Sequence, residues 1–193
     1  MRIKISSLVA TAALATTLTA CVSTGDLTTT PAKRPTAPAA SATTAGAPEE
    51  EAAGKEASIG DTLTLKGIED GEQLAATLKK WADPAESKDE FTEPQDGMRW
   101  VAAQFELVNT GTAVYDDSPS NGAQVADTEG QRFTSTFGDI TAGPSMASAV
   151  KLPKGEKALG WIVFEVPKTS KIASIQFTMN SGFADHTGQW AVK

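Results

Sequence analysis

The stretch Leu159-Gly160-Trp161-Ile162-Val163-Phe164-Glu165-Val166 is almost continuously apolar, and Pro167 follows it directly. Its β-branched and aromatic side chains favour a strand. A short apolar run bounded by a turn residue is typical of a strand that is buried on both faces. Because Pro167 cannot donate a ladder hydrogen bond, the strand is expected to end there. This stretch therefore predicts the central strand of a sheet.

Several other segments alternate between apolar and polar residues, as half-buried strands do. Between residues 98 and 108 the alternation places one set of side chains on a common face: Val101, Ala103, Phe105 and Leu107. The same pattern recurs at residues 62–65, 172–179 and 189–192. Residues 109–112 read as a turn. Residues 124–127 and 131–134 flank Glu129-Gly130, which predicts a hairpin with glycine supplying a positive φ.

Residues 72–81 are ambiguous. Leu74, Leu78 and Trp81 fall at the i, i+4 and i+7 positions of a helix, and the composition favours helix. The same residues also alternate, with Leu74, Ala76 and Leu78 on one side. Periodicity alone does not decide between the two structures. In a chain of antiparallel strands, a strand that pairs with residues 62–66 fits better.

The aromatic residues define the folded part of the chain. All seven Phe and all four Trp lie within residues 58–193. Short strands separated by Gly, Pro, Asn and Asp turns are typical of an antiparallel β-sandwich. We therefore predict an all-β sandwich over residues 58–193.

Charge and composition exclude several classes of protein. The formal net charge is −7, and an acidic chain repels phosphate backbones, so nucleic acid is not an expected partner. No stretch reaches the about 18 apolar residues of a spanning helix. With one Cys and one His, the chain can form neither an internal disulfide nor a typical zinc cage.

The N-terminus has the features of a bacterial lipoprotein signal peptide over residues 1–20. A short cationic segment precedes an uncharged apolar run, which ends in Leu18-Thr19-Ala20-Cys21. This ending resembles a lipobox, in which small residues precede a cysteine that accepts a diacylglycerol. Cys21 is the chain's one cysteine. We therefore expect a lipid anchor at Cys21 on the extracytoplasmic face of the cell membrane.

Residues 21–57 join this anchor to the predicted domain. After Cys21 the segment is dominated by Ala, Thr, Pro, Gly and Ser, and it has almost no large apolar side chain to bury. Such a composition cannot repay the entropy cost of ordering. We expect a disordered linker.

Residues 58–193 resemble the immunoprotective extracellular antigen family, an immunoglobulin-like group of Gram-positive surface lipoproteins. The resemblance rests on several stretches: Ile59–Leu63, Gly97–Phe105, Asn109–Gly111, Asp127–Gln131, Phe164–Pro167 and Ile175–Phe177. These motifs are strand patterns and turns. The resemblance implies an immunoglobulin-like sandwich outside the cytoplasm, and it implies no activity and no functional residues.

No catalytic signature is visible. His186 is the one imidazole, and the chain lacks a Gly-x-Ser-x-Gly elbow and a phosphate-binding glycine loop. Cys21 is expected to carry lipid rather than to act as a nucleophile. We therefore expect a protein that is not an enzyme and that needs no cofactor.

Two further features could bind a ligand: a group of oxygen-bearing side chains and an exposed Trp. Asp116, Asp117 and Asn121 offer oxygen atoms in a turn-rich segment, but Pro119 and Thr128 break the spacing of an EF-hand loop. We expect these residues and the acidic loop 83–96 to be solvated rather than to hold a metal. Trp161 lies in the apolar run. The other three Trp do not fall on the strand faces that are most clearly predicted to point inward. At least one of them is therefore expected to be exposed, where it could stack on a sugar.

The expected function is a lipid-anchored binding or interaction module of the cell envelope. Its partner would be a protein, a peptide or a cell-wall component. Two alternatives stay open: an accessory glycan-active or other hydrolytic enzyme of the wall, and a structural or ion-binding lipoprotein.

Overall fold

The structure is a computed structural model, and it describes residues 57–193. The predicted signal peptide, the lipobox Leu18, Thr19 and Ala20, the anchor Cys21 and the linker up to residue 56 lie outside the described residues. The strands are β1 (Ala57–Ser58), β2 (Thr62–Lys66), β3 (Gln73–Ala82), β4 (Met98–Asn109), β5 (Tyr115–Asp117), β6 (Ala123–Asp127), β7 (Arg132–Thr136), β8 (Val150–Leu152), β9 (Lys157–Pro167), β10 (Ile172–Thr178) and β11 (Thr187–Ala191). Two short 3-10 turns accompany them, η1 (Pro119–Gly122) and η2 (Asn180–Gly182).

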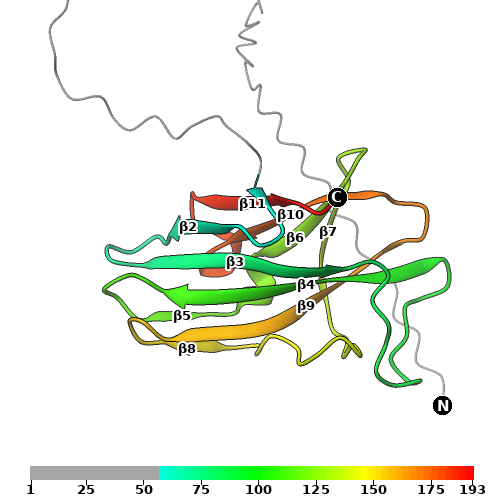
Figure 1. The fold of residues 1–193 in the computed structure, drawn as a ribbon, viewed down its shortest axis with the longest axis horizontal. Coiled ribbons are helices and arrows are strands. Elements are labelled where there is room, and N and C mark those ends of the chain that lie inside the picture. Colours follow the sequence, from blue (N-terminus) through cyan, green and yellow to red (C-terminus); the bar gives the residue numbers. More distant parts are fainter. Residues whose placement is uncertain (1–56) are drawn as a thin grey trace, which may run out of the picture. The chain divides into compact units, whose positions relative to one another are not determined.

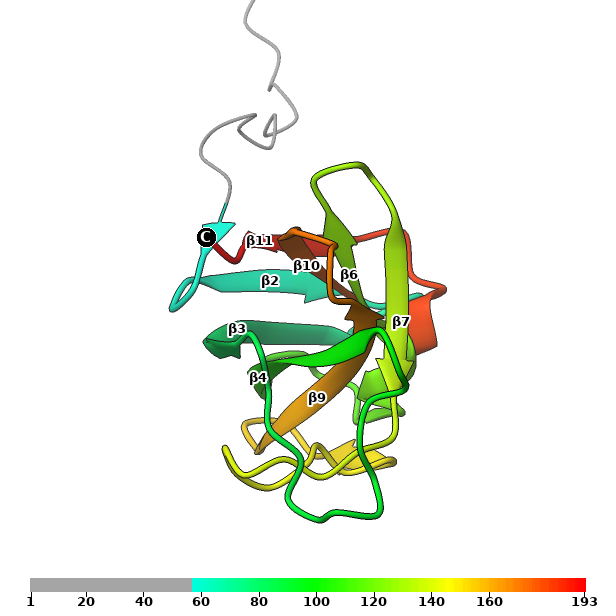
Figure 2. The same cartoon turned by 90° about the vertical axis from the view of Figure 1, so that its right-hand side faces the viewer.

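One long sheet folds over to make both layers of the sandwich. Its order is β1-β11-β10-β6-β7-β9-β4-β3-β2. Strand β7 connects the layers, because residues 132–134 pair with β6 while Ser135 and Thr136 pair with β9. Figure 2 shows β7 running from the layer that holds β6, β10 and β11 to the layer that holds β9 (Figures 1 and 2). The pairs are antiparallel except β1 with β11, which is parallel. Strands β5 and β8 form a separate small sheet.

The predicted strands are confirmed. Strand β9 lies between β7 and β4, and it ends at Pro167 as expected. The predicted inward face of β4 is fully buried, and so are Ile175, Phe177 and Met179. The predicted hairpin joins β6 and β7, with Gly130 at a φ of 86°. One detail is wrong: Leu159 is 54% exposed, because the segments that cover the outer face of β9 do not reach it.

The ambiguous segment is strand β3, which pairs with β2 and with β4. Its register shifts between Leu78 and Lys80, so that Lys79 is an extra residue opposite β4. This β-bulge returns Trp81 to the inner face after Leu78, where it packs against the main core. The helix-like spacing of Leu74, Leu78 and Trp81 therefore comes from regular alternation followed by a bulge.

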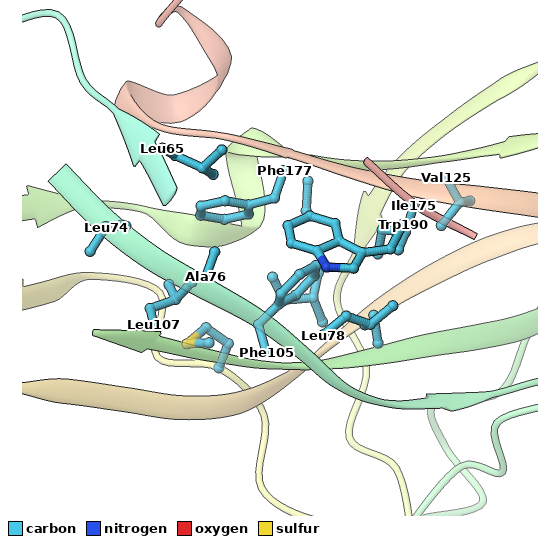
Figure 3. Close-up of a cluster of buried hydrophobic side chains, with 14 of the residues drawn as sticks. Leu65, Leu74, Ala76, Leu78, Phe105, Leu107, Val125, Ile175, Phe177 and Trp190 are labelled. Atoms are coloured by element: carbon cyan, nitrogen blue, oxygen red, sulfur yellow. The ribbon is translucent and has the colours of Figure 1, made fainter. Parts of the chain in front are cut away.

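The main core lies between the two layers and is centred on three aromatic rings (Figure 3). Phe105 of β4 meets Phe177 of β10 and Trp190 of β11, each with ring centroids 5.4 Å apart. The indole N–H of Trp190 donates to the backbone oxygen of Asp61 at 3.0 Å. The expectation of an exposed Trp is wrong. Trp100, Trp161 and Trp190 are buried, and Trp81 is half-buried.

Candidate functional site

Two loops cover part of the outer face of the layer that holds β4 and β9. They are residues 83–97, between β3 and β4, and residues 137–149, between β7 and β8. The loops bond to each other through their backbones: Lys88 N–H donates to the Asp139 oxygen at 2.9 Å, and Thr141 N–H donates to the Glu86 oxygen at 3.0 Å. The second loop also bonds to β9, where Trp161 exchanges backbone bonds with Pro144 and Met146. Together the loops form a cap on the sheet.

A second hydrophobic cluster lies under this cap, on the face opposite the main core. Trp100 and Ala102 of β4 pack with Trp161 and Val163 of β9, and the loops contribute Ala85 and Ile140. Gly138 lies against the Trp100 ring, where a side-chain Cβ would come 2.6 Å from a ring carbon. These contacts explain why Trp100 is buried although it points away from the main core. This second cluster, called the outer cluster below, also packs the loops of the cap against the sheet.

A groove with a volume of about 710 Å³ lies beside the cap. Its polar lining consists mainly of hydroxyl groups, from Thr92, Ser118, Ser120, Ser135, Thr136, Ser145 and Ser148, together with Asn121 and Asp139. Its apolar lining comes from Phe137, Met146, Trp161, Ile162 and Val163. Ligand pockets commonly fall in the range of about 300–1,000 Å³ and combine apolar walls with a few polar groups. The groove is therefore the candidate functional site.

The electrostatic character of the groove is nearly neutral. Of the lining residues, which all belong to the described part of the chain, Asp139 is the one ionisable side chain. The hydroxyl of Ser145 donates to the Asp139 carboxylate at 2.8 Å. No lysine, arginine or histidine of residues 57–193 lines the groove. The groove can therefore donate and accept hydrogen bonds but offers no cation to an anionic ligand.

One polar atom in the groove wall is unsatisfied. The indole N–H of Trp161 is buried and has no hydrogen-bond partner within residues 57–193. Gly143, which has a φ of 151°, lies next to this indole nitrogen. A Cβ at Gly143 would lie 3.0 Å from the nitrogen. A buried donor without a partner costs about 1–3 kcal/mol. Such a group in a native fold calls for an explanation, and ligand sites are one of the places where they occur.

Arg99 fixes the base of the loop 83–97. Its guanidinium forms two parallel bonds with the Asp83 carboxylate, at 2.7 and 2.9 Å. It also donates to the backbone oxygens of Pro167 and Ser170. The hydrogen bond with Asp83 raises the pKa of Arg99, so the guanidinium stays charged. Arg99 thereby ties this loop to the turn between β9 and β10.

A tight turn within the same loop positions Thr92 at the groove. The hydroxyl of Ser87 bonds to the backbone oxygens of Asp89 and Thr92, at 2.6 and 2.7 Å. The Asp89 carboxylate accepts from the backbone N–H groups of Phe91 and Thr92. A hydrogen bond with the Thr92 side chain and these backbone bonds lower the pKa of Asp89. One carboxylate of this acidic loop, that of Asp89, therefore stabilises the turn.

The candidate cation ligands are placed in different roles. Asp116 forms an exposed ion pair with Lys151 at 2.7 Å. The Asp117 carboxylate accepts from the backbone N–H and the hydroxyl of Ser181, at 2.9 and 2.7 Å. These bonds hold Ser181 in the left-handed region, at a φ of 54°. Asn121 lines the groove. Within residues 57–193 no group of three or more His, Cys, Asp or Glu residues is placed to hold a metal ion.

The remaining features noted in the sequence lie away from the groove or outside the described residues. His186 is exposed in the segment before β11 and does not line the groove. The segments 83–96 and 116–121 both line the groove, for example through Thr92 and Asn121, but neither contributes a carboxylate to the lining. Sequence reasoning missed the groove because its hydroxyl residues carry no periodic signal. Across residues 57–193, no helix has the length and apolar character needed to cross a membrane.

Solved structures share this fold at low sequence identity. The yjhA protein of Bacillus subtilis is 14% identical, with a TM-score of 0.50 over 71% of this chain and 99% of yjhA. The ycdA protein of Bacillus subtilis, provisionally described as a lipoprotein, is 13% identical, with a TM-score of 0.52 over 72% of this chain and 39% of ycdA. The secreted protein MPT63 of Mycobacterium tuberculosis is 18% identical, with a TM-score of 0.49 over 69% of this chain and 94% of MPT63. At such low identities, the structural similarity to yjhA and ycdA shows a common β-sandwich fold alone.

Sequence comparison assigns a family. No curated protein matches the chain significantly by sequence. A family profile does match, and it spans residues 69–187, from the turn before β3 to the start of β11. The match includes both loops of the cap and every residue that lines the groove. The chain therefore belongs to the family described as Domain of unknown function (DUF4352).

Proposed function

We propose that this protein is a non-enzymatic binding module of the cell envelope, anchored by lipid at Cys21, and that the groove is its ligand site. The observation that carries the proposal is the groove itself. It combines hydroxyl, amide and apolar lining on a face that is stabilised by its own hydrophobic cluster. A binding site on packed elements needs little reorganisation when a ligand arrives, which favours affinity.

The lipobox at Leu18–Cys21 and the resemblance to the immunoprotective extracellular antigen family support an extracytoplasmic location. The fold similarity to ycdA, itself provisionally described as a lipoprotein, agrees with this location. The position of β1 in the domain is also compatible with a tether. Strand β1, where the described chain begins, lies on the opposite side of the domain from the loops of the cap (Figure 2). The expected linker therefore joins the domain at a point remote from the cap loops.

The chemistry of the groove favours binding over hydrolysis. Glycosidases typically use two carboxyl groups that flank the scissile bond. The described lining offers one carboxylate, that of Asp139, and Ser145 already bonds to it. Ser–His hydrolysis needs an imidazole within hydrogen-bond reach of the nucleophile, whereas His186 lies outside the lining. The groove therefore has the donors and acceptors of a binding site without the paired groups of these two reactions.

The proposal is tested by sedimentation with isolated cell envelopes of the source organism. The full chain would carry Cys21→Ser, so that lipid does not contribute to binding. Ser148 is exposed in the groove, and Ser148→Trp would fill the groove without disturbing the core. We expect Ser148→Trp to lose most of the envelope binding.

The matched control is Phe183→Ala. Phe183 is 81% exposed and lies outside the groove lining, so this variant should bind like the parent chain. Equal binding by the parent chain and Ser148→Trp would contradict the proposal that the groove is the binding site.

A further inference from the structure

We infer that the groove binds a short, uncharged oligosaccharide. This inference rests on the proposed function and names the ligand class of the same site. It follows from three properties of the lining: its lack of cations, its many hydroxyl groups, and an exposed aromatic ring at its edge.

The charge of the lining argues against anionic ligands. Phosphate and carboxylate ligands are usually held by arginine, lysine or clustered backbone N–H groups. The described lining contains none of these basic side chains, and its one ionisable group is the Asp139 carboxylate. Bringing a second negative charge beside Asp139 would cost free energy. An uncharged ligand avoids this cost.

The hydroxyl groups match a ligand that is itself rich in hydroxyl groups. Each serine or threonine hydroxyl can donate one hydrogen bond and accept two. Three of the lining hydroxyls already bond within the protein: Ser135 to the Ser120 backbone oxygen, Ser145 to Asp139, and Thr92 to Asp89. Others form no hydrogen bond through their hydroxyl groups within residues 57–193, among them Ser118, Thr136 and Ser148. These hydroxyls can exchange bonds with a sugar in either direction.

The backbone of the groove argues against an extended peptide. A peptide that adds to a sheet needs a strand edge with free N–H and C=O groups. Here Ser135 and Thr136 of β7 already pair with Phe164 and Val163 of β9. The backbone N–H and oxygen of Trp161 are bonded to Pro144 and Met146. The strands that line the groove therefore offer little free ladder for a peptide.

The apolar part of the groove fits the C–H face of a sugar ring. Phe137 lines the groove with 95% of its surface exposed, and Met146, Trp161 and Val163 supply further apolar lining. An exposed aromatic ring in a site that also presents hydroxyl groups can cover the apolar face of a sugar while its hydroxyls bond to serine and threonine. A ligand that covers Phe137 also removes its apolar surface from water, which is favourable.

The test is calorimetric titration of the full chain carrying Cys21→Ser with a panel of neutral probes: chitotetraose, cellotetraose and mannotetraose. Polyglycerol phosphate serves as the anionic probe and a neutral tetrapeptide as the peptide probe. We expect at least one neutral glycan to bind. Loss of the stacking ring in Phe137→Ala should weaken that binding by roughly tenfold. Ser148→Trp should abolish binding, and Phe183→Ala should leave it unchanged.

The outcomes separate this inference from the proposed function. If no neutral glycan binds, or if the anionic or peptide probe binds in the groove instead, the oligosaccharide inference is wrong. The proposed function still stands in that case, provided that Ser148→Trp loses envelope binding. If a glycan binds equally to the parent chain, Phe137→Ala and Ser148→Trp, its site lies elsewhere and the inference is also wrong. If neither glycan nor envelope binding depends on the groove, both proposals fail.

Discussion

Tyr115 is the chain's single tyrosine, and it lies buried at the start of β5 beside Asp117. Burial of the phenol, and then the negative charge of Asp117, raise the pKa of Tyr115 above its ordinary value of 10.0. The unfolded chain therefore loses this proton at a lower pH than the folded chain does. Its contribution to stability is complete below pH 10.0 and is lost progressively as the pH rises above that value.

The raised pKa of Tyr115 predicts the outcome of an alkaline titration. In an alkaline titration of the folded protein, the ultraviolet absorbance of the phenolate should not appear near pH 10.0, and it should appear only as the fold is lost. The chain unfolded in urea should titrate normally and serves as the reference. Because only one tyrosine is present, the signal needs no assignment. Identical titration curves for the folded and unfolded chains would show that Tyr115 is not buried as described.

Asn109 is a buried polar side chain that closes the turn after β4. Its amide donates to the backbone oxygens of Ala113 and Leu152, at 2.8 and 2.7 Å, and its side-chain oxygen accepts from Gly111 N–H at 2.9 Å. Asn109→Ala would leave these groups without their partner. We expect a loss of about 3 kcal/mol in the free energy of unfolding, measured by urea denaturation. Asn121→Ala, at an exposed asparagine, should change it by less than about 0.5 kcal/mol. Equal effects of the two substitutions would refute this role of Asn109.

The bulge in β3 shows how one extra residue can make the spacing of a strand resemble that of a helix. Lys79 and Lys80 both face outward, so Trp81 returns to the inner face. Deleting Lys79 would remove the extra residue and leave a regular strand with Leu78 and Trp81 both facing inward. We expect this deletion to cost at most about 2 kcal/mol in urea denaturation. Deleting Ala75 from the regular part of the strand would instead reverse the faces of its neighbours, with a far larger loss. If both deletions were equally harmful, Lys79 would not be a bulge residue.

The sequence predicted the strands well because alternation is a local signal. The inward faces of β4 and β10 could be read directly from every second residue, as at Phe105 and Phe177. The burial of Trp100 could not, because it depends on loops distant in sequence that fold over the outer face of the sheet. The groove was missed for the same reason. Its lining joins Thr92, Asn121, Ser135 and Ser148, and only the tertiary fold brings these residues together.

Membrane attachment is a property of the whole chain. The lipobox predicts that Cys21 carries lipid. Substituting Cys21→Ala should therefore move the protein from the membrane fraction to the medium, or retain it as unprocessed precursor. Fractionation followed by immunoblotting measures the distribution, with Phe183→Ala as a control that keeps Cys21. Processed Cys21→Ala protein that stays in the membrane fraction would contradict a lipid anchor.

Different parts of the domain have different structural roles. The core between the layers holds the sandwich together, the outer cluster supports the cap, and the cap borders the groove. The cap loops contribute much of the groove lining. In the ribbon views these loops lie on the side of the domain away from β1 (Figures 1 and 2). We propose that the protein binds its envelope ligand in this groove.

Photo-crosslinking in isolated envelopes would locate the ligand on the protein surface. A photoreactive phenylalanine analogue would replace Phe137 in the groove or Phe183 outside it, two side chains that are 95% and 81% exposed. We expect a discrete crosslinked product from position 137 and none from position 183. We also expect that adding Ser148→Trp removes the product from position 137. Crosslinks of equal yield from both positions, or a product that survives Ser148→Trp, would contradict the claim that the groove is the ligand site.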